Sequence, residues 1–110
     1  MTGRVTGGVT PAGTFAVPPD HPCLPGHFPG QPLAPGVVLL DAAMLLALPA
    51  GVGLAGFAAV RFLRPVLPGD EVRVDAGPHA NGRLPFECLA GGEAVVRGVA
   101  LTRPLAQPLP

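Results

Sequence analysis

The chain lacks lysine and carries no excess of charge of either sign. Its seven basic residues are all arginine, seven Asp and Glu residues balance them, and the formal net charge is zero. Proteins that bind nucleic acid need a basic surface, often interleaved with aromatic residues, to contact phosphates and bases. No stretch of this sequence supplies that combination, so we expect no nucleic-acid partner.

Cysteine is also scarce. Cys23 and Cys88 lie far apart, without a C-x-x-C motif or a His-rich spacing, so neither a disulfide framework nor a zinc site is indicated. The N-terminal sequence "MTGRVTGGVTPAG" has no apolar core of the kind that marks a secretory signal. We therefore expect a cytoplasmic protein with reduced cysteines and no metal.

Charged residues make up only 13% of the chain, against 48% hydrophobic residues. At this length we expect residues 1–110 to form a single domain around one core, burying about 60–70% of the unfolded surface. The composition is apolar for a small protein. It predicts that a partner covers part of the surface, and hence a homodimer or a higher oligomer.

A charge-free run covers residues 42–60, "AAMLLALPAGVGLAGFAAV", and is long enough on its face to span a bilayer. Pro49 and the glycines after it interrupt the run, and Asp41 at its edge would be costly in lipid. These features favour a protein without a membrane span over the membrane alternative.

Residues 36–48, "GVVLLDAAMLLAL", form the best helix candidate. Pro35 suits a first helical turn, Pro49 ends the element, and the helix would be about 20 Å long. It is apolar on every face except at Asp41, so we expect a core helix enclosed by the rest of the protein.

Strand patterns surround this helix. "TFAV" at residues 14–17 is a short strand candidate, and alternating apolar and polar residues recur after the helix. They fall within residues 54–66, 70–76, 83–90 and 93–103, separated by the turn sequences "LPGD", "GPHANG" and "GG". One helix beside a run of antiparallel strands predicts an α+β domain in which the sheet wraps the helix.

Two ionisable residues frame the stretch "HFPGQPLAPGVVLLD". His27 lies among prolines and glycines, and Asp41 lies in an apolar run. Taken singly, such a His is more often a turn residue and such an Asp is more often solvated. The alternative is a catalytic pair.

The segment "PGHFPGQPLAPGVVLLDAA" resembles the active-site segment of the hotdog-fold β-hydroxyacyl-ACP dehydratases. In that family a G-H-F-P-G loop precedes a P-x-x-P-G helix start and an acid within the helix. "RFLRPVLPGDEV", residues 61–72, resembles the strand-turn-strand that follows the helix in the same family. The resemblance implies a hotdog fold, a substrate carried on the phosphopantetheine of an acyl carrier protein, no metal and no bound cofactor.

The residues suit this chemistry. Dehydration needs a base to remove the proton α to the thioester and an acid to protonate the departing hydroxyl. His27, with a reference pKa near 6.5, can be the base. Burial in apolar surroundings would raise the pKa of Asp41 and make it a proton donor. Backbone N–H groups at a helix start can bind the oxyanion, and Gly36 has that role in the resembling family.

Further residues are candidates for substrate or partner binding. Phe28, Pro35, Val37 and Leu40 are expected at the substrate tunnel, with Phe28 and Leu40, like Leu39, being either core or tunnel wall. Arg61 and Arg64 are either strand residues with an exposed face or a docking site for an acidic acyl carrier protein.

The chain departs from the family pattern in three ways. Its acid is Asp, as in the branch that also isomerises the enoyl product, where the simple dehydratases have Glu. Leu45 stands where the family usually has Gln, and an N-terminal "H-R-Y-P-F"-like segment is lacking. Two alternatives therefore stay open: a weak or inactive hotdog subunit that binds acyl chains or pairs with an active subunit, and a hotdog thioesterase.

Overall fold

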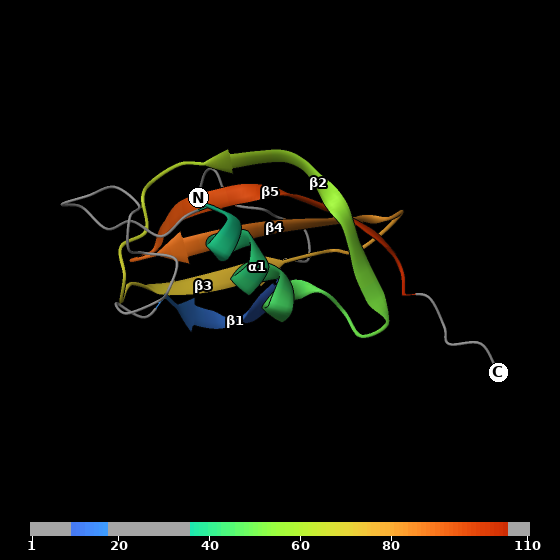
Figure 1. Cartoon of the computed structure of the whole chain (residues 1–110), viewed down its shortest axis with the longest axis horizontal. Helices are drawn as coiled ribbons and strands as arrows, with labels where there is room; N and C mark the ends of the chain where they lie inside the picture. Colours follow the sequence, from blue (N-terminus) through green and yellow to red (C-terminus); the bar gives the residue numbers. More distant parts are fainter. Residues whose placement is uncertain (1–9, 18–35, 106–110) are drawn as a thin grey trace.

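The computed structural model of the chain describes residues 10–17 and 36–105. Its elements are β1 (Thr10–Ala16), α1 (Gly36–Ala47), β2 (Val52–Phe62), β3 (Glu71–Ala76), β4 (Arg83–Ala90) and β5 (Glu93–Pro104). The strands form one antiparallel sheet in the order β1-β3-β4-β5-β2, and α1 lies across one face of it (Figure 1). The predicted α+β architecture, a helix followed by a run of antiparallel strands, is confirmed.

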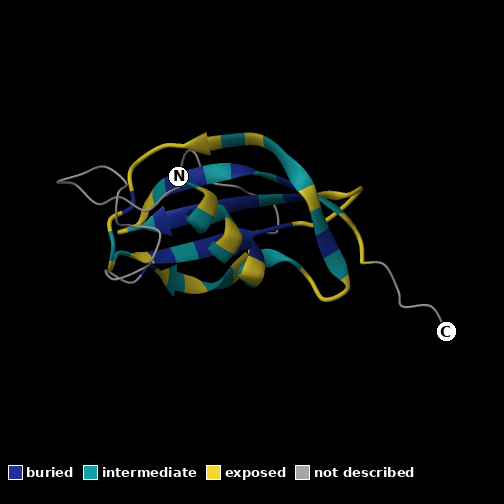
Figure 2. Ribbon diagram, viewed as in Figure 1, coloured by how far each residue is buried: buried dark blue, intermediate teal, exposed yellow. Residues whose placement is uncertain are grey.

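The hydrophobic core lies between α1 and the sheet. Leu39, Ala43 and Met44 are the buried residues of the helix, and their spacing places them on one helical face. The strands turn alternate side chains toward that face, and burying each large apolar side chain contributes about 1.5–3 kcal/mol. The sheet contributes Val72, Val74, Leu84, Phe86, Cys88, Val96 and Ala100. In Figure 2 the buried positions accordingly run along β3, β4 and β5.

The ends of α1 agree with the prediction to within one residue. The helix begins at Gly36 and ends at Ala47, and the Leu48 N–H still donates to the Met44 carbonyl at 3.1 Å. Pro49 has no N–H with which to continue the helix, and Gly51, at φ 78°, turns the chain into β2. In the described part of the chain no helix has the length and hydropathy needed to cross a membrane.

The prediction that α1 is enclosed is wrong for the single chain. Val37 is 64% exposed and Leu45 is 88% exposed, and Asp41, midway between them, is exposed as well. Residues four apart lie above one another on a helix, so these three form an exposed line, here called the outer stripe. Figure 2 shows the exposed side of α1 facing away from the sheet. One sheet can cover only one side of a helix, and the described residues provide no second layer.

Candidate active site

Asp41 lies near the middle of α1, on the outer stripe. It makes no hydrogen bond or ion pair with any described residue. Its side chain borders a groove of about 400 Å³ that is otherwise lined by Met44, Leu45 and Leu48. The prediction that apolar surroundings bury Asp41 is therefore wrong within one chain, but the surface around its carboxylate is apolar as predicted.

Gly36 lies five residues before Asp41, which is about 7.5 Å along the helix axis. As the first residue of α1 it belongs to the turn whose N–H groups have no partner within the helix. One short helix thus presents hydrogen-bond donors at its start and a carboxylate little more than one turn later. Together these groups can bind a developing oxyanion and, when the carboxyl group is protonated, supply a proton.

The remaining predicted residues of the catalytic pair and the tunnel have different outcomes. Val37 lies on the outer stripe, whereas Leu40 is partly buried and packs against the core. His27, Phe28 and Pro35 lie outside the described residues. The roles assigned to them stay predictions.

The two predicted docking arginines have different surroundings. Arg61 is exposed near the end of β2, opposite Arg97 of β5, and has no ion pair within the described residues. Arg64 pairs with Glu93. It lines a cleft of about 450 Å³ together with the acidic residues Asp70, Glu71 and Glu93. Within the part of the chain that the structure describes, the charge of Arg64 is thus offset by its neighbours, whereas that of Arg61 is not.

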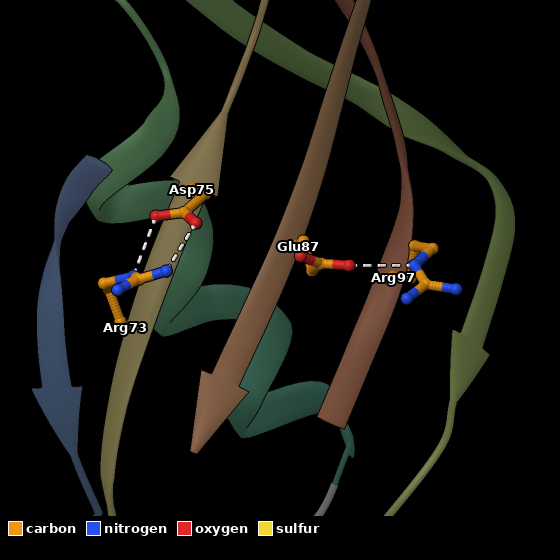
Figure 3. Close-up of polar contacts among 4 residues, drawn as sticks. All are labelled: Arg73, Asp75, Glu87 and Arg97. Atoms are coloured by element: carbon orange, nitrogen blue, oxygen red, sulfur yellow. Dashed lines mark hydrogen bonds and ion pairs between the residues drawn. The ribbon is translucent and has the colours of Figure 1, made fainter. Parts of the chain in front are cut away.

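Two buried acids occupy the sheet. Asp75 of β3 and Glu87 of β4 are 4% and 1% exposed and lie directly opposite each other. Arg73 donates two hydrogen bonds of 3.1 Å to Asp75, and Arg97 donates one of 3.0 Å to Glu87 (Figure 3). In Figure 3 these side chains lie on the face of the sheet opposite α1. Because both carboxylates are paired with guanidinium groups, they stabilise the sheet and are poorly suited to donate a proton.

Cys88 has no catalytic role. The thiol is free and buried in the core. Burial raises its pKa to about 12, and the negative charges of Glu87 and Asp75 add to the effect. Since a thiolate is the nucleophilic form of cysteine, this residue is an inert packing group, as the sequence predicted.

Three residues near the site escaped the sequence-based prediction. Met44 and Leu48 line the groove beside Asp41, and Phe62 packs against Gly36. The helical spacing of residues 41, 44, 45 and 48 was a usable signal for the groove. Phe62 carried a weaker signal, because it lies in the segment "RFLRPV" that resembles the dehydratases.

Known proteins resemble this chain in sequence and in fold. The family model "ApeI-like: ApeI dehydratase" matches residues 8–99. The chain is 39% identical over 66 residues to the 3-hydroxyacyl-(acyl-carrier-protein) dehydratase FabZ of Desulforamulus reducens, and 40% identical over 67 residues to FabZ of Haemophilus influenzae. The two alignments each cover 51% of this chain, and 46% and 45% of the relatives. The matched part is thus about half the length of these curated relatives.

Solved structures also resemble this chain. The dehydratase heterocomplex ApeI:P from Xenorhabdus doucetiae superimposes with a TM-score of 0.70 at 26% identity, covering 81% of this chain and 82% of that one. An uncharacterised protein from Erwinia carotovora subsp. atroseptica gives 0.68 at 28% identity, covering 93% and 90%. A thioesterase from Thermus thermophilus, at 21% identity and a TM-score of 0.57 over 90% and 86% of the two chains, shares the fold alone.

These likenesses confirm the predicted hotdog fold, in which the antiparallel sheet packs around α1. The matched region of the family model includes α1, β2, β3, β4 and most of β5, so it holds every described residue of the candidate site. With the family model covering most of its length, the chain belongs to the ApeI-like dehydratase family.

Proposed function

We propose that the chain dehydrates β-hydroxyacyl thioesters to trans-2-enoyl thioesters in fatty-acid, polyketide or aryl-polyene type biosynthesis. The observation that carries the proposal is the position of Asp41. Within the described residues it is an unpaired carboxylate beside an apolar groove, little more than one turn from the start of α1. Membership of a dehydratase family supports the same reaction.

The reaction needs three groups. His27 removes the proton from the carbon α to the thioester, and the electron pair moves toward the thioester oxygen. The amide of Gly36 stabilises the negative charge on that oxygen. As the electrons return to form the α–β double bond, the C–O bond breaks and Asp41 protonates the departing hydroxyl, which leaves as water. We propose that no metal and no bound cofactor takes part.

The exposed outer stripe supports a site completed by a second subunit. A hotdog partner that pairs with β2, an edge strand among the described strands, would extend the sheet and bring its own residues toward α1. Covering Val37 and Leu45 would also exclude water from the apolar groove beside Asp41. The partner is a second copy of this chain or, by analogy with the dehydratase heterocomplex ApeI:P, another hotdog subunit. If the partner is a different subunit, this chain could be the catalytically weak or inactive subunit that pairs with an active one.

The direct test uses the reverse reaction. Crotonyl thioesters of an acyl carrier protein and of coenzyme A are incubated with the protein, and mass spectrometry follows the addition of water across the double bond. We expect hydration of the carrier-bound substrate. Release of free crotonate without hydration would indicate a thioesterase, and an unchanged substrate on both carriers would contradict the proposed activity.

We propose that the substrate arrives on an acyl carrier protein in the cytoplasm. Arg61 is the better docking candidate because the charge of Arg64 is already offset by Glu93. Arg61→Glu is expected to raise the apparent KM for a carrier-bound substrate about tenfold, with little change for a pantetheine thioester, because a rim charge steers the acidic carrier but not a small substrate. Steady-state kinetics with both substrates measure the difference.

Two variants control this experiment. Arg83→Glu makes the same change of charge at another exposed strand arginine, at the start of β4, and should leave both KM values unchanged. Arg64→Glu should have a smaller effect than Arg61→Glu. An equal rise in KM for the carrier-bound and the pantetheine substrate would show that Arg61 acts on something other than the carrier.

A further inference from the structure

Gly36 is in contact with an aromatic ring. A Cβ atom added to it would lie 2.7 Å from Cζ and 2.9 Å from Cε1 of Phe62, closer than real Cβ contacts. Gly36 does not have a positive φ, so its helical backbone is one that any L-residue adopts. The ring of Phe62, and not the backbone conformation, is therefore what a side chain added at the start of α1 would meet.

The orientation of Phe62 depends on a bulge in β2. Phe57 and Phe62 are five residues apart and would point to opposite faces of a regular strand. The register with β5 shifts between Ala58 and Arg61, so that Phe57 pairs with Ala100 and Phe62 with Val96. The β5 partners are four residues apart and both belong to the core, which places the two phenylalanines on the helix side of the sheet.

The bulge itself is built from specific residues. Ala59 adopts φ 55°, in the left-handed region. Val60 then approaches Gly98 so closely that a Cβ there would lie 2.9 Å from Val60 Cγ2. Bulges commonly re-aim a side chain next to a functional site. Here the re-aimed side chain is Phe62, and its target is the first residue of α1.

We infer that Phe62 is a positioning residue for the oxyanion donor, and this inference rests on the proposed function. Its ring packs on Gly36 at the point where the helix N–H groups are free, and so fixes where the amide lies relative to the substrate. Phe62 is also 53% exposed. Because Phe62 is not one of the buried core residues, its contact with Gly36 can be removed without emptying the core.

A mutant cycle tests the inference with the full chain and a crotonyl pantetheine thioester. Phe62→Ala and Gly36→Ala should each lower kcat for hydration about tenfold with little change in KM, because a small misplacement of a stabilising group is costly. In the double variant the added methyl group meets no ring. Its kcat should therefore be no lower than that of either single variant, instead of the roughly hundredfold loss expected for independent effects.

Matched controls separate positioning from stability. Leu63→Ala removes the neighbouring side chain, which is 44% exposed, and should leave kcat unchanged. The thermal unfolding midpoint should fall no more for Phe62→Ala than for Leu63→Ala, whereas a purely structural role would lower stability together with activity.

The outcomes distinguish this inference from the proposed function. A wild-type protein without hydration activity would overturn the proposed function and, with it, the positioning role. An active wild type in which the two single losses multiply, or in which Phe62→Ala keeps full kcat, would overturn the role of Phe62 and leave the proposed function standing. A double variant that matches the singles supports both.

Discussion

Replacing His27 by Ala or Asp41 by Asn is expected to lower turnover by about a hundredfold or more, the usual range for losing a general base or acid. Asn keeps the size of the Asp41 side chain but cannot donate the proton that the departing hydroxyl needs. Because Asp41 is exposed and has no partner among the described residues, the substitution should not disturb the fold of the chain. The rate of hydration of crotonyl thioesters measures the loss, and circular dichroism checks the fold.

Two further variants sharpen this result. Asp41→Glu should be milder than Asp41→Asn because it keeps a carboxyl group. Glu71→Gln makes a matched acid-to-amide change at an exposed residue at the start of β3 and should leave turnover unchanged. Near-normal turnover in either His27→Ala or Asp41→Asn would show that the assignment of base and acid is wrong.

The secondary structure could be predicted because local signals agreed with the fold. Pro35 and Pro49 bracket the helix, and the alternating strands are separated by glycine turns. These local patterns did not predict the order of the strands in the sheet. That order depends on which strands bury their apolar faces against Leu39, Ala43 and Met44, and this is a property of the whole domain.

The exposure of Asp41 in one chain could not be predicted, for a different reason. A helix that is apolar all round indicates that every face is covered, but it does not say by which chain. The sheet covers the face of Ala43, and the outer stripe of Val37, Asp41 and Leu45 remains exposed in one chain. The apolar pattern of the helix therefore fits an assembled protein better than a single subunit.

The contact between Phe62 and Gly36 was hidden by the bulge. Counting residues in steps of two from Phe57 assigns Phe62 to the wrong face, because the count assumes a regular strand. The positive φ of Ala59 breaks that assumption. Alanine rarely adopts a left-handed conformation, so no sequence pattern marked the position.

The exposed outer stripe also suggests how two subunits could build one catalytic site between them. In the hotdog dehydratases that the sequence resembles, each site takes its histidine from one chain and its acid from the other. If this chain forms such a two-fold dimer, each of its two sites needs His27 of one protomer and Asp41 of its partner. The exposure of Asp41 in the single chain is what such an arrangement requires, because a partner can then reach the carboxylate.

Mixing His27→Ala and Asp41→Asn chains, each inactive alone, should therefore restore activity. After unfolding and refolding together, about half of the dimers should contain one chain of each kind. Such a dimer has one site with both residues intact and one with both replaced, so activity should return to about a quarter of wild type. Hydration kinetics of the mixture measure the recovery, and size-exclusion chromatography shows that the refolded protein is dimeric.

Two controls show whether regained activity comes from mixed dimers. Mixing without unfolding should restore little activity if subunits exchange slowly, and each variant refolded alone should stay inactive. If both residues served the same site from one chain, every site in every mixed dimer would lack one of them, and no activity could return. A refolded mixture that is dimeric and remains inactive would thus rule out the shared site, while the hotdog fold and the family assignment would be unaffected.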